Sequence, residues 1–216
     1  MSSGPVLETE RLVLRRWRQE DLEPFAALNG DPVVMELFPA PLSRAESDAF
    51  MQRIEMHFER RGFGMWAVEV RETGALAGLT GLAVPGFDAP FMPAVEVGWR
   101  LAHSHWGKGY APEAAAAALT FGFSRLGLRE IVSFTAVANH RSRRVMEKLG
   151  MRRSEADDFD HPLLPPGHHL RRHVLYRMRA TEWLSGAGRA RSPDNPGLPA
   201  RSGHGGPENR SRPDCS

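Results

Sequence analysis

One segment, residues 94–126, restricts the fold of this chain more than any other. Apolar residues alternate with other residues over positions 94–101, which predicts a strand. Five consecutive alanines followed by Leu119, Phe121 and Phe123 predict a helix over residues 112–126, opened by a proline whose missing N–H would have no helical partner. Between the two, the chain reads Trp106-Gly-Lys-Gly-Tyr-Ala111. A strand, a glycine turn and a helix therefore follow one another directly.

This turn has the chemistry of an anion site. Backbone N–H groups at the start of a helix converge at the positive end of the helix dipole, which suits a pyrophosphate. Gly107 and Gly109 leave room there, because a Cβ would hold a phosphate away from the amides. The charge of Lys108 is secondary, since its side chain points outward if its amide binds phosphate. Taken alone, a Gly-x-Gly turn can equally be a tight structural turn.

The remaining pattern predicts a mixed α/β sheet rather than a doubly wound one. We expect the other strands at residues 7–16, 64–70, 76–84, 131–137 and 168–178. We expect the other helices at residues 21–28, 45–61 and 139–149. Ser43 and Glu46 form a capping box for the second of these helices, and Gly150 closes the last. Together these elements predict one domain over residues 8–184.

Residues 185–216 differ in composition from the rest of the chain. They hold six glycines and five prolines, and Leu198 is their only large apolar residue, so we expect a disordered Gly/Pro/Arg-rich tail. The tail carries five arginines against three acidic residues, whereas residues 1–184 hold 23 basic and 23 acidic residues. The pI of about 9.1 is thus a property of the tail, and without clustered lysines it does not predict nucleic acid as the main partner.

Several other classes of protein and site are disfavoured. No apolar run approaches the roughly 20 residues that span a bilayer, and residues 1–5 lack the features of a secretory signal, so we expect a cytoplasmic protein without a membrane partner. Cys215 is the only cysteine, which excludes an intrachain disulfide and disfavours a catalytic thiol. No metal site is expected, because no cysteine and no helical spacing accompany the neighbouring histidines, which are read as pocket or surface residues: His161, His168, His169 and His173.

The glycine turn resembles the pyrophosphate loop of the GNAT N-acetyltransferases, specifically the RimJ/RimL-like branch, in which it commonly reads Trp-Gly-Lys-Gly-Tyr-Ala before a Glu-Ala helix. This chain matches through Glu113-Ala114. The block from Asn139 to Gly150 is similar to the family's Asn-x-x-Ser helix, which lies beside the pantetheine arm. Weaker agreements extend the resemblance over about residues 8–184. The resemblance implies a GNAT-type fold that binds acetyl-CoA through Trp106, Gly107, Lys108, Gly109, Tyr110, Ala111, Asn139 and Ser142.

Acetyl transfer to an amine needs a base, donors to the carbonyl oxygen and a donor to the departing thiolate, but no metal. Glu96 resembles in its placement a carboxylate that other GNAT enzymes use as the base; the alternative is that it pairs with Arg100 or Arg15. By the same resemblance, Ser142 donates to the thiolate or the cofactor, although it can also serve the helix start. Asn139 binds pantetheine, caps its helix, or does both.

The sequence therefore predicts an acetyl-CoA-dependent N-acetyltransferase in which a primary amine attacks directly in a ternary complex. The acceptor is left open between a protein N-terminal α-amine, which the branch suggests, and a small-molecule amine. Deprotonation at pH 7 costs roughly 1.1 kcal/mol for an α-amine and about 4.6 kcal/mol for a lysine, which favours α-amines. The alternative function is a non-catalytic CoA-binding regulatory module that lacks a competent base. The oligomeric state is also open, a homodimer included.

Overall fold

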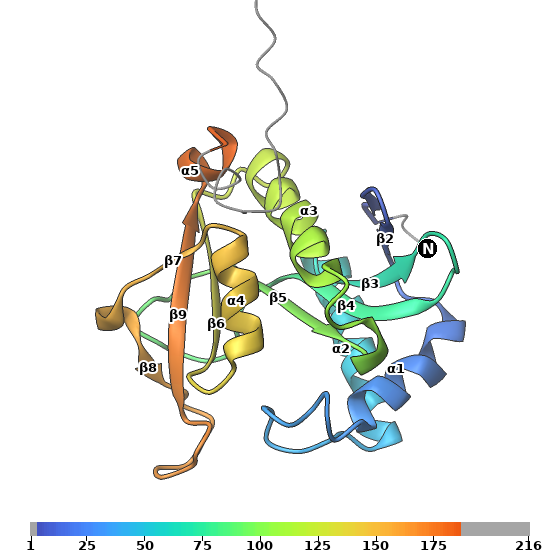
Figure 1. Cartoon of the computed structure of the whole chain (residues 1–216), viewed down its shortest axis with the longest axis horizontal. Helices are drawn as coiled ribbons and strands as arrows, with labels where there is room; N and C mark the ends of the chain where they lie inside the picture. The colour runs from blue at the N-terminus through green and yellow to red at the C-terminus, as the bar shows by residue number, and fades with distance from the viewer. Residues whose placement is uncertain (1–3, 187–216) are drawn as a thin grey trace, which may run out of the picture.

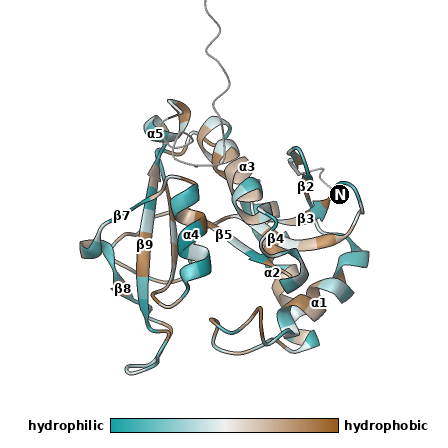
Figure 2. Cartoon of the chain, in the orientation of Figure 1, coloured by the Kyte–Doolittle hydropathy of each residue, from teal (hydrophilic) through white to brown (hydrophobic). Residues whose placement is uncertain are grey.

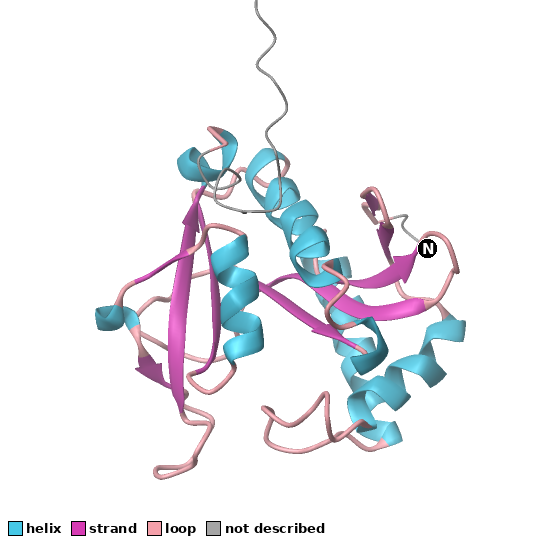
Figure 3. Ribbon diagram, in the orientation of Figure 1, coloured by secondary structure: helices cyan, strands magenta, loops and turns pink. Residues whose placement is uncertain are grey.

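The structure is a computed structural model that describes residues 4–186 of the chain. One nine-stranded sheet has the order β1-β2-β3-β4-β5-β6-β9-β7, and β8 also pairs with β9 (Figures 1 and 3). The strands are β1 (Leu7–Glu8), β2 (Leu12–Arg15), β3 (Met65–Val70), β4 (Leu76–Ala83), β5 (Glu96–Leu101), β6 (Glu130–Ala136), β7 (Arg152–Arg153), β8 (Phe159–Asp160) and β9 (Arg172–Arg179). The helices are α1 (Leu22–Gly30), α2 (Arg44–Arg61), α3 (Tyr110–Ser124), α4 (His140–Lys148) and α5 (Ala180–Leu184).

All neighbouring strands run antiparallel except β5 and β6, which are parallel, so the expected mixed sheet is confirmed. The capping box is present as well: the Glu46 N–H donates to Ser43 Oγ at 3.3 Å, and the Ser43 N–H donates to Glu46 Oε2 at 2.7 Å. Within the described residues, no helix is long and apolar enough to cross a membrane. The expected tail, residues 185–216, lies almost wholly outside the described part of the chain.

The expected single strand over residues 7–16 is wrong, because the segment folds into β1 and β2 around a turn. The Thr9 N–H donates to the Leu12 carbonyl at 3.0 Å, and the Leu12 N–H donates to Thr9 Oγ1 at 2.9 Å, which closes this turn. No glycine or proline marks the position, so the apolar alternation conceals it.

The last strand also differs from its prediction, since β9 begins at Arg172 rather than at residue 168. A turn occupies residues 168–171, where the Arg171 N–H donates to the His168 carbonyl at 2.9 Å. The two-residue strands β7 and β8 and the short helix α5 were not expected. The other predicted strands and helices agree with the structure to within a few residues.

The main core lies between the sheet and the helices packed against it, and Figure 2 shows apolar residues along the sheet and α3. Leu12, Trp66, Leu82 and Leu119 are fully buried there. Gly122 of α3 lies directly on the sheet, because a Cβ at this position would come within 2.6 Å of the Ile131 side chain. The helix that follows the glycine turn is therefore held tightly against the strands.

The sheet divides after the first residues of β5 and β6. The only registered pair between these strands is Glu96 with Val132, next to a hydrogen bond of 2.9 Å from the Val132 N–H to the Val95 carbonyl. Beyond this point β5 and β6 diverge (Figure 1). Two parallel strands that separate leave backbone and side chains of both facing the space between them. The division of the sheet thus creates the site described next.

Candidate functional site

Two neighbouring cavities occupy the region where β5 and β6 diverge. The first, of about 320 Å³, lies between the glycine turn, α4 and the segment after α1. The second, of about 390 Å³, lies between the separated parts of β5 and β6 and is closed by residues 37–39 and 161–170. Six residues line both cavities and form the boundary between them: Leu37, Phe38, Trp99, Arg100, Asn139 and Ser142.

The glycine turn forms one wall of the first cavity. Gly107 and Gly109 have φ values of +74° and +80°, in the left-handed region where glycine is favoured. A Cβ at Gly107 would meet no protein atom within 4 Å, so its small size serves the turn and the space beside it rather than packing. The side chain of Trp106 is held in place by a hydrogen bond, in which its Nε1–H donates to the Leu101 carbonyl at 2.8 Å. Trp106 thereby fastens the turn to the end of β5.

A cluster of side chains from the β1–β2 turn holds the glycine turn from outside. Arg11 donates from Nη1 to the Lys108 carbonyl at 2.9 Å and from Nε to Glu113 Oε2 at 2.7 Å. Thr9 Oγ1 donates to Glu113 Oε1 at 2.6 Å. Burial alone would raise the pKa of Glu113, but the hydrogen bonds from Thr9 and Arg11 outweigh it and lower that pKa. We call these four residues the Arg11 clamp; Glu113 was noted in the sequence only as part of a motif.

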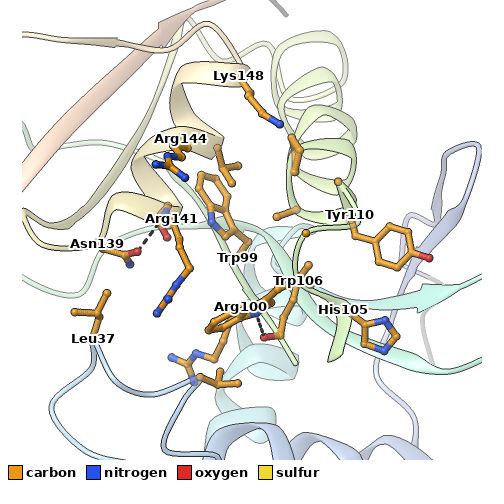
Figure 4. Close-up of a pocket in the computed structure, with 18 of the residues that line it drawn as sticks. Leu37, Trp99, Arg100, His105, Trp106, Tyr110, Asn139, Arg141, Arg144 and Lys148 are labelled. Carbon is orange, nitrogen blue, oxygen red and sulfur yellow. Dashed lines mark hydrogen bonds between the residues drawn. The ribbon is translucent and has the colours of Figure 1, made fainter. Parts of the chain in front are cut away.

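Basic side chains from α4 form the opposite wall of the first cavity. Arg141, Arg144 and Lys148 follow one another at intervals of three and four residues, which places them along one side of the helix. Figure 4 shows them on the α4 side of the cavity, across from Trp106 and Tyr110. Arg141 also lies over the Trp106 ring, with Cζ 4.5 Å from the ring centroid. Positive charge and helix-start amides thus face one space, which fits an anionic ligand. These three cations were not among the site residues expected from the sequence, although their spacing of three and four positions is visible there.

Asn139 and Ser142 stand where the two cavities meet. The Ser142 N–H donates to Asn139 Oδ1 at 3.1 Å, so Asn139 is the N-cap of α4. This was one of the two roles predicted for Asn139 from the sequence. Asn139 Nδ2 donates to Thr135 Oγ1 at 2.9 Å, which fixes the orientation of the amide. The Ser142 hydroxyl makes no hydrogen bond to any other described residue. It is therefore available to a ligand, and the cofactor roles of both residues stay predictions.

Glu96 lies in the second cavity at the point where the sheet divides. Its carboxylate has no ion pair or hydrogen bond among residues 4–186. Neither pairing considered from the sequence is present there: Arg15 bonds to Asp21 and Glu69, and Arg100 bonds to Asn29. Burial raises the pKa of Glu96 to about 8, because no charge or donor offsets the loss of water around the carboxylate. The site therefore holds a carboxyl group that titrates near neutral pH.

Comparison with known proteins identifies this arrangement. A family model described as an acetyltransferase (GNAT) domain matches residues 11–152. The chain belongs to the GNAT acetyltransferase family. The FsC-acetyl coenzyme A-N(2)-transacetylase of Aspergillus fumigatus is 33% identical over 199 residues, which cover 85% of this chain and 80% of that protein. The N-acetyltransferase YoaA of Bacillus subtilis is 31% identical over 157 residues, which cover 69% of this chain and 84% of that protein.

A crystal structure of a GNAT-family acetyltransferase from Bacillus anthracis superimposes with a TM-score of 0.68 at 26% identity, covering 82% of this chain and all of that one. The GNAT fold expected from the sequence is thereby confirmed, and the chain is an acetyltransferase. Members of this family use acetyl-CoA as cosubstrate. The glycine turn and three residues of the Arg11 clamp lie inside the matched region, whereas Thr9 precedes it and β8 and β9 follow it.

Most residues that line the second cavity of this GNAT acetyltransferase are apolar, and its charged or titratable side chains are Glu96, Arg100 and two histidines. His161 and His173 line it as the pocket reading anticipated, and their rings lie 4.9 Å apart. His173 Nδ1 lies 3.1 Å from the Arg171 carbonyl, and burial is the main cause that lowers the pKa of both histidines. No group of three or more histidine, cysteine or acidic side chains in the described chain is placed to hold a metal ion.

Proposed function

We propose that this chain is an acetyl-CoA-dependent N-acetyltransferase of the RimJ/RimL-like branch, and that a primary amine attacks directly in a ternary complex. The observation that carries the proposal is the pair of cavities that meet at Ser142, one basic and bordered by helix-start amides, the other apolar with a buried carboxyl group. Two substrates can occupy these cavities together, as direct transfer requires. The branch is supported by the match of the turn from Trp106 to Ala111 and the Glu113-Ala114 pair that follows.

The first cavity fits the phosphates of acetyl-CoA. Gly107 and Gly109 line this cavity, a Cβ at Gly107 would meet no protein atom within 4 Å, and Arg141, Arg144 and Lys148 supply positive charge opposite the turn. When bound, acetyl-CoA supplies a thioester with an electrophilic carbonyl and a thiolate leaving group. Because charged contacts to phosphate are screened by salt, we expect the affinity for acetyl-CoA to fall as ionic strength rises.

The boundary between the cavities supplies the groups that orient the pantetheine arm and protonate the departing sulfur. Asn139 has a second lone pair on Oδ1 beyond its cap to α4, which can accept from an amide of the pantetheine arm. The unpartnered Ser142 hydroxyl lies in the wall of both cavities and is assigned as the donor to the departing sulfur. These assignments place cofactor recognition and leaving-group stabilisation on one turn of α4.

Glu96 is assigned as the base. A carboxyl group of pKa about 8 and an α-ammonium of pKa about 7.8 have nearly equal proton affinity, so a proton passes between them, directly or through water, at little cost. Most Glu96 side chains are protonated at pH 7, and the fraction that can act as a base grows as pH rises through 8. The catalytic rate should follow that fraction.

The competing function, a CoA-binding regulatory module, requires the first cavity but not the second. A half-buried carboxyl group without a partner in the described chain is costly to keep, and its presence beside the cofactor cavity favours turnover. The test is the release of CoA from acetyl-CoA in the presence of a panel of amines and N-terminal peptides. Release that depends on an amine supports the enzyme, whereas tight acetyl-CoA binding without release for every acceptor would establish the regulatory module.

A further inference from the structure

Arg100 is a half-buried cation without an anionic partner among the described residues. Its Nη1 donates to Asn29 Oδ1 at 2.6 Å, and its Cζ lies 4.1 Å from the ring centroid of Phe38 and 5.5 Å from that of Phe50. Its Nε is buried and has no hydrogen-bond partner in the part of the chain that the structure describes. Within residues 4–186, Nη2 makes no hydrogen bond and no carboxylate lies within ion-pair distance of the guanidinium. One amide oxygen and two aromatic faces therefore surround a full positive charge.

Other arginines of this protein show what the edge formed by Nε and Nη2 normally holds. In Arg16 these two nitrogens lie 3.1 and 2.5 Å from the same oxygen of Glu55. In Arg153 they lie 3.0 and 2.5 Å from the two oxygens of Asp158. Arg11 and Arg177 hold carboxylates by the same edge. The planar fork of a guanidinium matches the two oxygens of a carboxylate, and in Arg100 this edge has no such partner.

Arg100 lies in the wall of the second cavity, the cavity assigned to the acceptor amine. Glu96, Gly98 and Arg100 share one face of β5, so a carboxyl group and a guanidinium border one cavity at strand positions roughly 13 Å apart. A Cβ at Gly98 would lie 3.7 Å from Glu96 Oε1, which shows that the carboxyl group leans along the strand over this glycine. Apolar side chains, among them Met65 and Leu164, form most of the remaining wall.

We propose that the acceptor is a small amine that carries a carboxylate, and that Arg100 binds this carboxylate through Nη2, because Nε is buried from solvent. This inference rests on the proposed function and specifies its substrate class, to which amino acids belong. The amine lies toward Glu96 and the body of the molecule lies against the apolar wall. A cavity of about 390 Å³ has the size typical of small-molecule sites. Burial lowers the pKa of Arg100 to about 10, so the guanidinium stays charged at neutral pH.

A cofactor phosphate is the other source of an anion for Arg100, because this residue also borders the first cavity. That cavity already contains Arg141, Arg144 and Lys148 together with the amides of the turn. The Arg100 guanidinium also lies 5.5 Å from the ring centroid of Phe50, which lines the second cavity and not the first. This contact favours the acceptor as the source of the anion.

The experiment measures binding of product analogues to the full chain saturated with CoA, by calorimetry. The probes are three pairs, the N-acetyl derivatives of alanine, leucine and phenylalanine and their carboxamides, which differ only in the charge that Arg100 is proposed to bind. We expect the carboxylate of at least one pair to bind 10-fold or more tightly than its carboxamide. Arg100→Met should remove this preference with less than a 3-fold change for the carboxamide, and Arg100→Lys should keep part of it.

Arg144→Met is the matched control, because it removes a cation from the first cavity alone; it should weaken CoA and leave the carboxylate preference intact. Equal binding of carboxylate and carboxamide in all three pairs, which needs no variant and so no assumption about folding, would overturn the proposal. So would a preference that survives Arg100→Met, or a loss of CoA affinity as the only effect of that variant. Since binding requires no turnover, a failure of acetyl transfer is recorded separately by CoA release.

Discussion

Replacing Glu96 by glutamine tests two effects of this residue separately: its ionisation lowers the free energy of unfolding, and its carboxylate acts as the base in catalysis. Glutamine keeps the shape of the side chain and remains neutral at every pH. Glu96 in the folded protein has a pKa of about 8, raised by burial from 4.5, and no partner among the described residues offsets the change. The variant should therefore unfold less readily than the wild type at neutral pH, although it loses activity.

The sign and size of the effect follow from proton linkage. Between pH 4.5 and 8 the folded protein keeps the Glu96 proton while the unfolded chain releases it, so the contribution of Glu96 is full below pH 4.5 and is lost as pH rises through 8. The loss is about 1.4 kcal/mol per pH unit. The Glu96→Gln variant does not undergo this loss, because glutamine does not ionise. Its free energy of unfolding should exceed that of the wild type by about 3 kcal/mol at pH 7 and about 5 kcal/mol at pH 9, and the difference should vanish near pH 4.5.

Urea unfolding of both proteins at pH 5, 7 and 9 measures this difference, because every other titrating group is common to the two. Glu72→Gln is the control, since Glu72 is exposed in the turn between β3 and β4 and no burial penalty applies. A free energy difference between Glu96→Gln and the wild type that stays constant with pH would refute the assignment of a buried, unpaired carboxyl group.

The kinetic half of the experiment tests the role as base. The wild-type kcat/KM for the amine should rise with pH through 8 as Glu96 ionises. Glu96→Gln should lower kcat/KM on the order of 10² to 10⁴-fold, with acetyl-CoA affinity nearly unchanged. Because an α-amine of pKa about 7.8 itself titrates near pH 8, the pH profile is compared with an acceptor amine whose pKa lies well above 8, and with that acceptor the inflection near pH 8 should be absent from the variant. A variant that loses activity but keeps the inflection with that acceptor would show that another group of the enzyme titrates there and that Glu96 is not the base.

Three further predictions concern the cofactor side of the site. Gly107→Ala and Gly127→Ala both introduce a Cβ into open space at positive φ, +74° and +66°, so each should lose about 1 kcal/mol of stability, but only the first should weaken acetyl-CoA binding in calorimetry. Equal affinity of the two variants for acetyl-CoA would remove the turn from the binding site. Glu113→Gln weakens the Arg11 clamp and should raise the Kd for acetyl-CoA several-fold without abolishing folding; an unchanged Kd would make the clamp purely structural. Ser142→Ala should lower kcat about 10-fold or more while the Kd for acetyl-CoA changes little, and an unaltered kcat would exclude this hydroxyl as the donor to the leaving sulfur.

Much of the local structure could be read from neighbouring residues. The capping box at Ser43, the left-handed end of α4 at Gly150 and the strand, glycine turn and helix from β5 to α3 all appear where the pattern indicated. The break between β1 and β2 could not be read, because it depends on the Thr9 side chain rather than on a glycine or proline. The alternation of apolar residues therefore predicted one continuous strand across this break.

The functional site combines residues that are distant in sequence. Arg11 and Glu113, which hold the glycine turn, are 102 positions apart, and no spacing in the chain predicts their contact. The basic side of α4 was visible as a pattern, but only the packing of that helix shows that it faces the turn. The sequence named Arg100 solely as an alternative partner for Glu96, whereas the structure separates the two and leaves both without a counter-charge in the described chain.

The sequence by itself determined the order of the longer strands and helices, the glycine turn and the family, because caps, turns and periodicity depend on residues within a few positions of one another. The tertiary structure alone decided that β5 and β6 separate after Glu96, that two cavities meet at Ser142, and that burial raises the pKa of one carboxyl group to about 8. The free energy of a charge depends on the water and partners that surround it, and these are supplied by segments from the whole length of the fold.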